Sequence, residues 1–228
     1  MKILTIICAF FICISVQGQF AIIRDNDGFT YVRNEEKKGN NIIDTLKNDH
    51  LIYCFEKSNN WTNIDFEKQG KDLNGYIYHN RFKLISSFES FKIQHQTNLS
   101  IALKKDSIEI KLFKGEFEKS KYKFKYTSNE KDQIALINRE KYWGTDGGIP
   151  KYEYTKIIVN LGSQKITLPK AATENLFEPS LFNTEAFYDE STNTIYIQSM
   201  NSDGAGSYLV IWKIVNGKYS ERFVAYGF

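Results

Sequence analysis

The sequence has little cysteine, histidine or proline, and each of these residues occurs only three times among 228 positions. Cys8 and Cys13 lie in an apolar N-terminal stretch, so a chain processed beyond it would keep only Cys54 and form no internal disulfide. No histidine follows His95. The second half therefore lacks the residues for a Ser-His-Asp triad, a Cys-His pair or a histidine-ligated zinc site. We expect neither a metal nor a cofactor.

The sequence also lacks a hydrophobic run of the about 20 residues that span a bilayer. Its longest run, Ile3–Val16, follows Lys2 and precedes Gln17-Gly18-Gln19. A positive tip, a short apolar run and small residues at a cut site are typical of a secretory signal peptide. We expect this peptide to cover residues 1–18, with cleavage before Gln19. The protein would then be periplasmic or secreted, with no stable membrane insertion.

A strong charge of one sign is absent as well, since the formal net charge is only +3. The lysines are interleaved with aspartates and glutamates along the chain. This pattern is typical of a solvated surface and differs from the basic stripe of a nucleic-acid-binding protein. We therefore expect no nucleic-acid partner.

Aromatic residues are plentiful, with 14 tyrosines and 17 phenylalanines. Short runs of alternating apolar and polar residues recur, whereas stretches with helical periodicity are missing. The pattern predicts a mainly all-β, antiparallel protein. One short helix is expected over Lys170–Phe177, between Pro169 and Pro179. The clearest hairpin signal is Asn216-Gly217, because Asn-Gly suits a type I′ turn.

A change in composition near Ser86 predicts two domains, residues 19–85 and 86–228. In the first, an Asp-Gly turn opens the alternating run "DGFTYVR", and three further segments follow in order: "IIDTL", "SNNWTNI" and "GYIYHNRFKLI". This succession resembles the bacterial SH3 domain. The loop "NEEKKGNN" departs from the family pattern because it has no proline, and Tyr31 replaces the usual asparagine.

The resemblance implies a small, strongly bent barrel of five to six strands. Such domains are commonly appended to exported proteins that act at the cell wall, and some bind peptidoglycan peptides. Tyr31, Trp61, Tyr76 and Tyr78 are the candidate ligand groove, because flat amphipathic rings stack on peptides and sugars. In the alternative interpretation, Trp61 and Tyr76 fill the barrel core.

The second domain resembles no family, but it contains two Asp-Gly turns between aromatic strand residues: "YWGTDGGIPKYEY" and "SMNSDGAGSYLVIW". Asp146 and Asp203, with neighbouring Asn201, could line one ligand site. Trp143 and Tyr208 would form the sides of this site, and the glycines would let a ligand approach the backbone. The alternative is that these segments are ordinary hairpin or bulge turns.

Taken together, these features favour an exported, non-enzymatic binding protein of the bacterial envelope. Its partner would be a peptidoglycan peptide or glycan, or an envelope or secreted protein. One alternative is an inhibitor or immunity protein that blocks a wall-degrading enzyme or a toxin. Another is a glycan-acting enzyme with paired carboxylates, for which Asp146 and Asp203 are the candidates.

Overall fold

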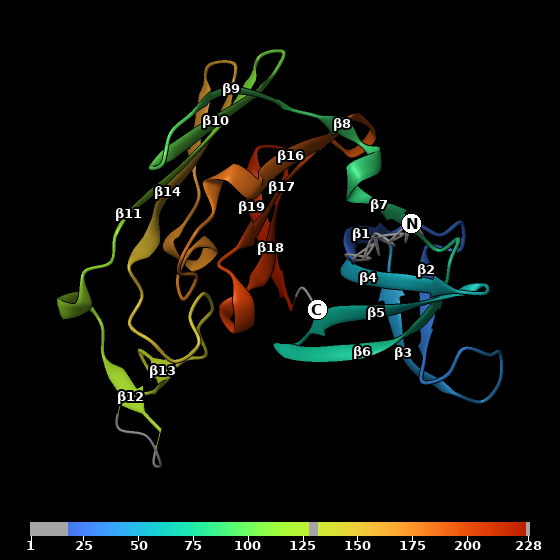
Figure 1. The fold of residues 1–228 in the computed structure, drawn as a ribbon. Coiled ribbons are helices and arrows are strands. Elements are labelled where there is room, and N and C mark those ends of the chain that lie inside the picture. Colours follow the sequence, from blue (N-terminus) through green and yellow to red (C-terminus); the bar gives the residue numbers. More distant parts are fainter. Residues whose placement is uncertain (1–17, 128–131, 227–228) are drawn as a thin grey trace, which may run out of the picture.

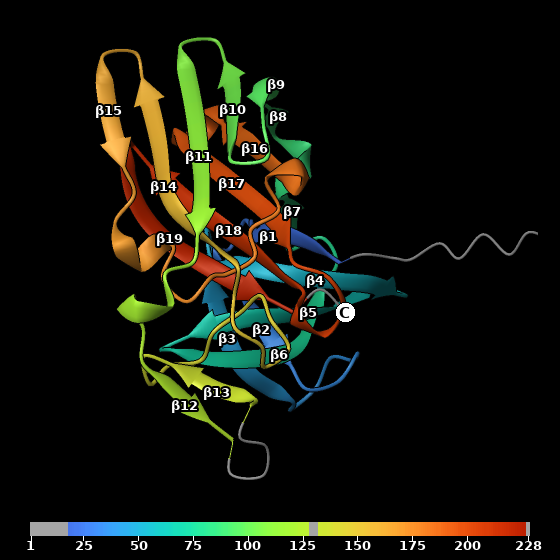
Figure 2. The same cartoon turned by 60° about the vertical axis from the view of Figure 1, so that its left-hand side comes forward.

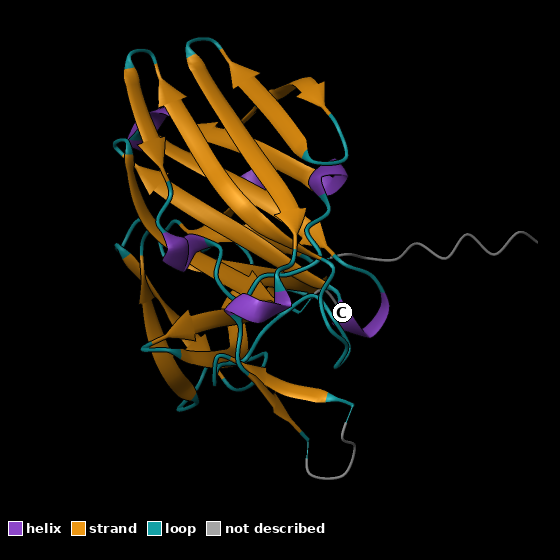
Figure 3. Cartoon of the chain, turned by 90° about the vertical axis from the view of Figure 1, so that its left-hand side faces the viewer, coloured by secondary structure: helices purple, strands orange, loops and turns teal. Residues whose placement is uncertain are grey.

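A computed structural model describes residues 18–127 and 132–226 of the chain. The described residues form antiparallel strands, which confirms the all-β prediction (Figure 3). The expected signal peptide lies almost wholly outside the described residues. Among the described residues, no helix is long and apolar enough to cross a membrane.

The N-terminal domain is a curled sheet of seven strands, against the five to six that the SH3 resemblance implies (Figure 1). Its strand order is β3-β2-β6-β5-β4-β1-β7. Buried aliphatic side chains fill its interior, among them Ile23, Val32 and Ile64. The strands are β1 (Gln19–Ile23), β2 (Phe29–Arg33), β3 (Ile42–Lys47), β4 (Leu51–Ser58), β5 (Trp61–Lys68), β6 (Lys71–Tyr78) and β7 (Phe82–Leu84).

The C-terminal domain is built from two facing five-stranded sheets and a two-stranded hairpin (Figure 2). One sheet has the order β15-β14-β11-β10-β9 and the other β19-β18-β17-β16-β8, while β12 pairs with β13. The strands are β8 (Glu89–Ser90), β9 (Lys92–Gln96), β10 (Ser100–Lys105), β11 (Ile108–Glu116), β12 (Phe124–Tyr126), β13 (Ile134–Ile137), β14 (Tyr152–Leu161), β15 (Gln164–Thr167), β16 (Thr184–Asp189), β17 (Thr194–Asn201), β18 (Tyr208–Val215) and β19 (Lys218–Ala225).

Strand β18 is buried on both faces, which explains its nearly continuous apolar sequence "YLVIWKIV". Val210 and Trp212 point into the core between the two C-terminal sheets. Ile211 points the other way and packs with Phe20 and Tyr53 of the N-terminal domain. The sheet that carries β18 therefore separates two hydrophobic cores, one within the C-terminal domain and one between the domains.

The chain passes from one domain to the other at the 3₁₀ turn η1, because β7 completes the N-terminal sheet and β8 begins the C-terminal one. The expected helix over Lys170–Phe177 is wrong beyond its first turn, η3. Leu176 and Phe177 instead form β-bridges with Trp143 and Glu153, so tertiary pairing replaces the second helical turn. The 3₁₀ turns are η1 (Ile85–Ser87), η2 (Lys119–Lys121), η3 (Lys170–Ala172), η4 (Leu181–Asn183), η5 (Glu190–Thr192) and η6 (Gly204–Gly206).

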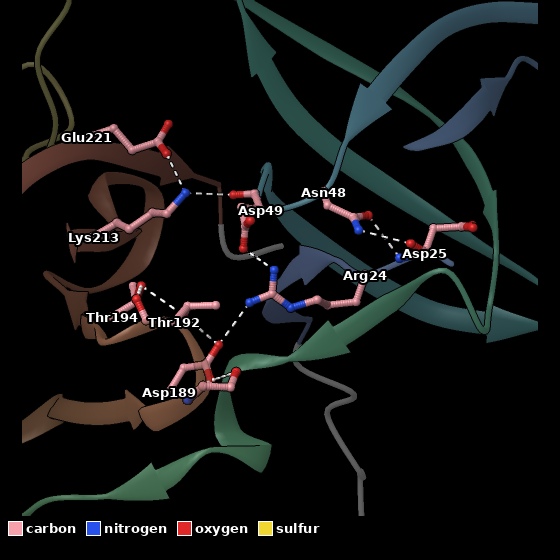
Figure 4. Close-up of polar contacts among 10 residues, drawn as sticks. Arg24, Asp25, Asn48, Asp49, Asp189, Thr192, Thr194, Lys213 and Glu221 are labelled. Carbon is pink, nitrogen blue, oxygen red and sulfur yellow. Dashed lines mark hydrogen bonds and ion pairs between the residues drawn. The ribbon is translucent and has the colours of Figure 1, made fainter. Parts of the chain in front are cut away.

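Polar contacts also join the domains, beside the apolar interface (Figure 4). Arg24, the residue after β1, donates to the carboxylates of Asp49 and Asp189, with 2.8 Å between its Nη2 and Asp189 Oδ2. The ammonium of Lys213 donates to the carbonyl oxygen of Asp49 at 2.7 Å and to Glu221 at 3.0 Å. These contacts and the apolar core hold the two domains in one relative orientation.

Candidate functional site

An aromatic cleft of about 260 Å³ opens on the N-terminal domain, and we call it the N-terminal cleft. It contains three of the four tyrosine and tryptophan residues expected there. Its wall comprises Asp25, Asp27, Phe29, Thr30, Tyr31, Arg33, Lys38, Trp61, Tyr78 and Arg81. Residues from β2, from the loop after β2 and from the β5–β6 pair meet here because β2 and β5 both flank β6 in the sheet. The cleft thus brings Tyr31 and Tyr78, which are far apart in the sequence, to one surface.

The rings of the cleft differ in how far they are exposed. Tyr31 is 44% exposed and packs edge-on against Phe29, with 5.3 Å between the ring centroids. Trp61 is only 9% exposed and lies edge-on to Tyr78 at 5.4 Å. Trp61 therefore supports the fold and also forms part of the cleft wall. Tyr76, which precedes Tyr78 by two residues on β6, does not line the N-terminal cleft.

Two cations lie over the rings of this cleft. The guanidinium of Arg33 is 6.0 Å from the centroid of the Trp61 ring, and Lys38 Nζ is 6.0 Å from that of Tyr78. Arg33 is fixed by donating to the carbonyl of Gly39 at 2.9 Å and to Asn41 Oδ1 at 2.7 Å. Because its guanidinium is held on the neighbouring loop, Arg33 keeps its position over the indole without a ligand.

At the other end of the cleft, Arg81 forms an ion pair with the buried carboxylate of Asp25 at 2.5 Å. Burial raises the pKa of Asp25, but the hydrogen bonds from the Asp27 N–H and from Arg81 outweigh it, and the net pKa lies below its ordinary value. Asp25 is therefore a charged anchor for Arg81. The cleft combines aromatic rings with fixed charges of both signs, an arrangement suited to a polar ligand that carries some apolar surface.

A second, shallower cleft of about 760 Å³ lies on the C-terminal domain between the two Asp-Gly turns, and we call it the turn cleft. Asp146 and Asp203 both line it, so the fold brings together the two turns that the sequence singles out. Ser202 Oγ donates to the carbonyl of Gly144 at 2.7 Å. At Gly206, a Cβ would come within 2.9 Å of the Thr145 Cα. The turns thus contact each other directly, and this close approach requires glycine.

Three of the predicted site residues do not line the turn cleft but lie beneath its surface: Asn201, Tyr208 and Trp143. Asn201 is fully buried, and its Oδ1 accepts hydrogen bonds from Tyr154 Oη and from the Ser180 N–H, each at 2.9 Å. The Tyr208 hydroxyl donates to the carbonyl of Phe177 at 2.9 Å. Trp143 packs against Tyr208, with 6.1 Å between the ring centroids. The polar side-chain atoms of Asn201 and Tyr208 are thus directed into the protein.

Several residues of these clefts carry no signal in the sequence. Lys151 and Glu178 line the turn cleft, where the Glu178 carboxylate accepts from the backbone N–H of Lys151. Glu178 has a φ of 50°, in the left-handed region that few glutamates adopt. Its position depends on the bridge that Phe177 forms with β14, which residue types alone do not reveal.

Cys54 is buried, and burial raises the pKa of its thiol well above the ordinary value. In the described ranges 18–127 and 132–226, no group of three or more histidine, cysteine, aspartate or glutamate residues is placed to hold a metal ion.

Comparisons with protein-family models, with curated proteins and with solved structures find no match for this chain.

Proposed function

We propose that this chain is an exported binding protein of a bacterial envelope, and that its N-terminal cleft holds a peptidoglycan peptide or glycan. The observation that carries the proposal is the convergence of Tyr31, Trp61 and Tyr78 in one cleft with Arg33 and Lys38 over the rings. Rings provide stacking area at low entropic cost, and the cations pair with ligand carboxylates. The likeness to bacterial SH3 domains supports the same ligand class.

The C-terminal domain would act as a fixed platform for this cleft. Its apolar interface with the N-terminal domain buries Phe20, Tyr53 and Phe223 among others. A ligand bound on the N-terminal domain would therefore keep a constant orientation relative to the C-terminal domain. Because Arg33 is already held by Gly39 and Asn41, it also loses little conformational entropy when a ligand binds.

A pull-down on purified insoluble peptidoglycan tests the proposal, using residues 19–228 as the expected secreted chain. We expect retention of this chain and a loss of at least about ten-fold in apparent affinity for Tyr31→Ala, because an exposed stacking ring is removed. Tyr126→Ala is the matched control, since Tyr126 is 40% exposed, like Tyr31, but lies outside the cleft. Equal retention of both variants, or no retention of the parent chain, would refute the proposal.

A further inference from the structure

We infer that the turn cleft is a second binding site, and that its ligand is a neutral oligosaccharide. The inference concerns the C-terminal domain, not the N-terminal cleft, and it does not depend on the function proposed for that cleft. It rests on two observations: unpaired polar groups of both signs and an aromatic ring that lines the same cleft.

The first observation is that the cleft presents polar groups with no partner among the described residues. The carboxylates of Asp146 and Asp203 line the cleft without forming a hydrogen bond or ion pair there. The ammonium of Lys151 lies on the same surface, is exposed and is likewise unpaired. Acceptors and a donor therefore face the same space. A sugar hydroxyl donates and accepts at once, so a polyol matches both kinds of group, whereas a simple cation or anion matches only one.

The second observation is the ring of Tyr152, which also lines the cleft. Lys114 Nζ lies 4.9 Å from the centroid of this ring and donates to the carbonyl of Pro179 at 3.0 Å, so a fixed ammonium covers one face of the ring. An aromatic ring among polar groups provides an apolar surface on which the C–H face of a sugar can stack. The cleft is broad, with a volume of about 760 Å³, which is enough for several sugar rings.

Gly148, in the turn that carries Asp146, provides a probe of this surface. A Cβ added there would meet no atom within 4 Å, and its φ lies outside the left-handed region that favours glycine. A methyl group at this position would therefore project into the turn cleft without a clash inside the protein. The neighbouring Gly144 differs, because a Cβ there would come within 2.2 Å of the Phe177 carbonyl oxygen.

Gly148 gives a sharp experiment, because Gly148→Ala adds a methyl group to the cleft without disturbing the fold. The probes are chitotetraose and cellotetraose, titrated into residues 19–228 and followed by NMR. We expect saturable binding of at least one probe and a weakening of about ten-fold or more for Gly148→Ala. Gly39→Ala is the matched control, since Gly39 is also open and free of positive φ but lies in the N-terminal domain. A midpoint of thermal unfolding at or slightly above that of the parent chain for Gly148→Ala would show that the fold is intact, because alanine restricts the unfolded chain more than glycine does.

The carboxylates give an independent test. We expect Asp146→Asn and Asp203→Asn each to weaken tetrasaccharide binding by about ten-fold, because each removes a charge-assisted hydrogen bond. Glu56→Gln, at an exposed carboxylate of the N-terminal domain, should leave binding unchanged. The inference is overturned if neither tetrasaccharide binds, if Gly148→Ala binds like the parent chain, or if Tyr31→Ala abolishes the binding. The last result would place the sugar in the N-terminal cleft.

Discussion

The guanidinium of Arg24 in the N-terminal domain donates to the carboxylate of Asp189 in the C-terminal domain, across 2.8 Å and 165 residues of sequence. The Asp189 side chain is only 4% exposed. Burial raises the pKa of Asp189, but hydrogen bonds from Ser191, Thr192 and Arg24 outweigh it and keep the net pKa below its ordinary value. This buried anion and its cation link the two halves of the molecule.

Arg24→Met should therefore destabilise the protein by about 3 kcal/mol, because it leaves a buried carboxylate without its cation. Urea unfolding followed by circular dichroism measures the change. Lys37→Met is the matched control, because the ion pair of Lys37 with Glu35 is exposed on both sides. Lys37→Met should lower the free energy of unfolding by about 0.5 kcal/mol or less. An equal effect of the two substitutions would show that the Arg24–Asp189 contact does not stabilise the interface.

Phe20→Ala tests the apolar part of the same interface. The Phe20 ring is 3% exposed and lies 5.2 Å from the Tyr53 ring and 6.0 Å from the Phe223 ring, measured between centroids. Truncating this side chain should lower the free energy of unfolding by about 3–5 kcal/mol. The parent chain should unfold in one transition, and the variant in two, as followed by the tryptophan fluorescence of both domains. Phe182→Ala, at a ring that is 63% exposed, should change little. A single transition with unchanged stability in Phe20→Ala would contradict the account.

His50 should make the stability depend on pH. Burial lowers its pKa, the positive charges of Lys213 and Lys68 lower it further, and Glu221 opposes them. Because the folded pKa lies below the unfolded value of about 6.5, the unfolded chain binds more protons just below that pH. The free energy of unfolding should thus be highest above pH 6.5 and fall as the pH drops through the folded pKa. His50→Gln should flatten this part of the curve, and an unchanged slope would refute the assignment.

Cys54 should be unreactive in the folded protein. Its thiol is buried, and burial raises its pKa, so little thiolate is present and little reagent reaches it. Mass spectrometry after treatment with iodoacetamide at pH 8 should find residues 19–228 unmodified in the native state and singly modified in urea. Rapid native labelling would mean that the core of the N-terminal domain opens readily.

Local signals in the sequence predicted much of the fold. Asn216-Gly217 forms the turn between β18 and β19, with φ values of 49° and 70°, as the type I′ signal requires. The alternating run from Phe29 to Arg33 is β2, with Thr30 and Val32 buried on one face. Glycine often marks a turn, yet Gly115 lies inside β11 beside a bulge at Phe113, because pairing with β14 extends the strand through it.

Contacts between residues far apart in the sequence could not be predicted from local sequence patterns. The Asp-Gly turns could be found as turns, but their direct contact depends on the packing of the whole C-terminal domain. Asn201 resembled a ligand residue because polar side chains beside a turn are often exposed, yet it is buried and satisfies Tyr154 and Ser180. No sequence pattern indicates which polar residues a tertiary contact will bury.

The central claim is that the N-terminal cleft binds a cell-wall fragment, and an NMR titration with a soluble disaccharide-peptide from peptidoglycan tests it most directly. The side-chain N–H signal of Trp61 reports on the N-terminal cleft, and those of Trp143 and Trp212 report on the C-terminal domain. We predict a saturable shift of the Trp61 signal that is lost in Tyr31→Ala and kept in Tyr126→Ala. An unmoved Trp61 signal at saturating fragment, or a shift that Tyr31→Ala leaves intact, would contradict the account.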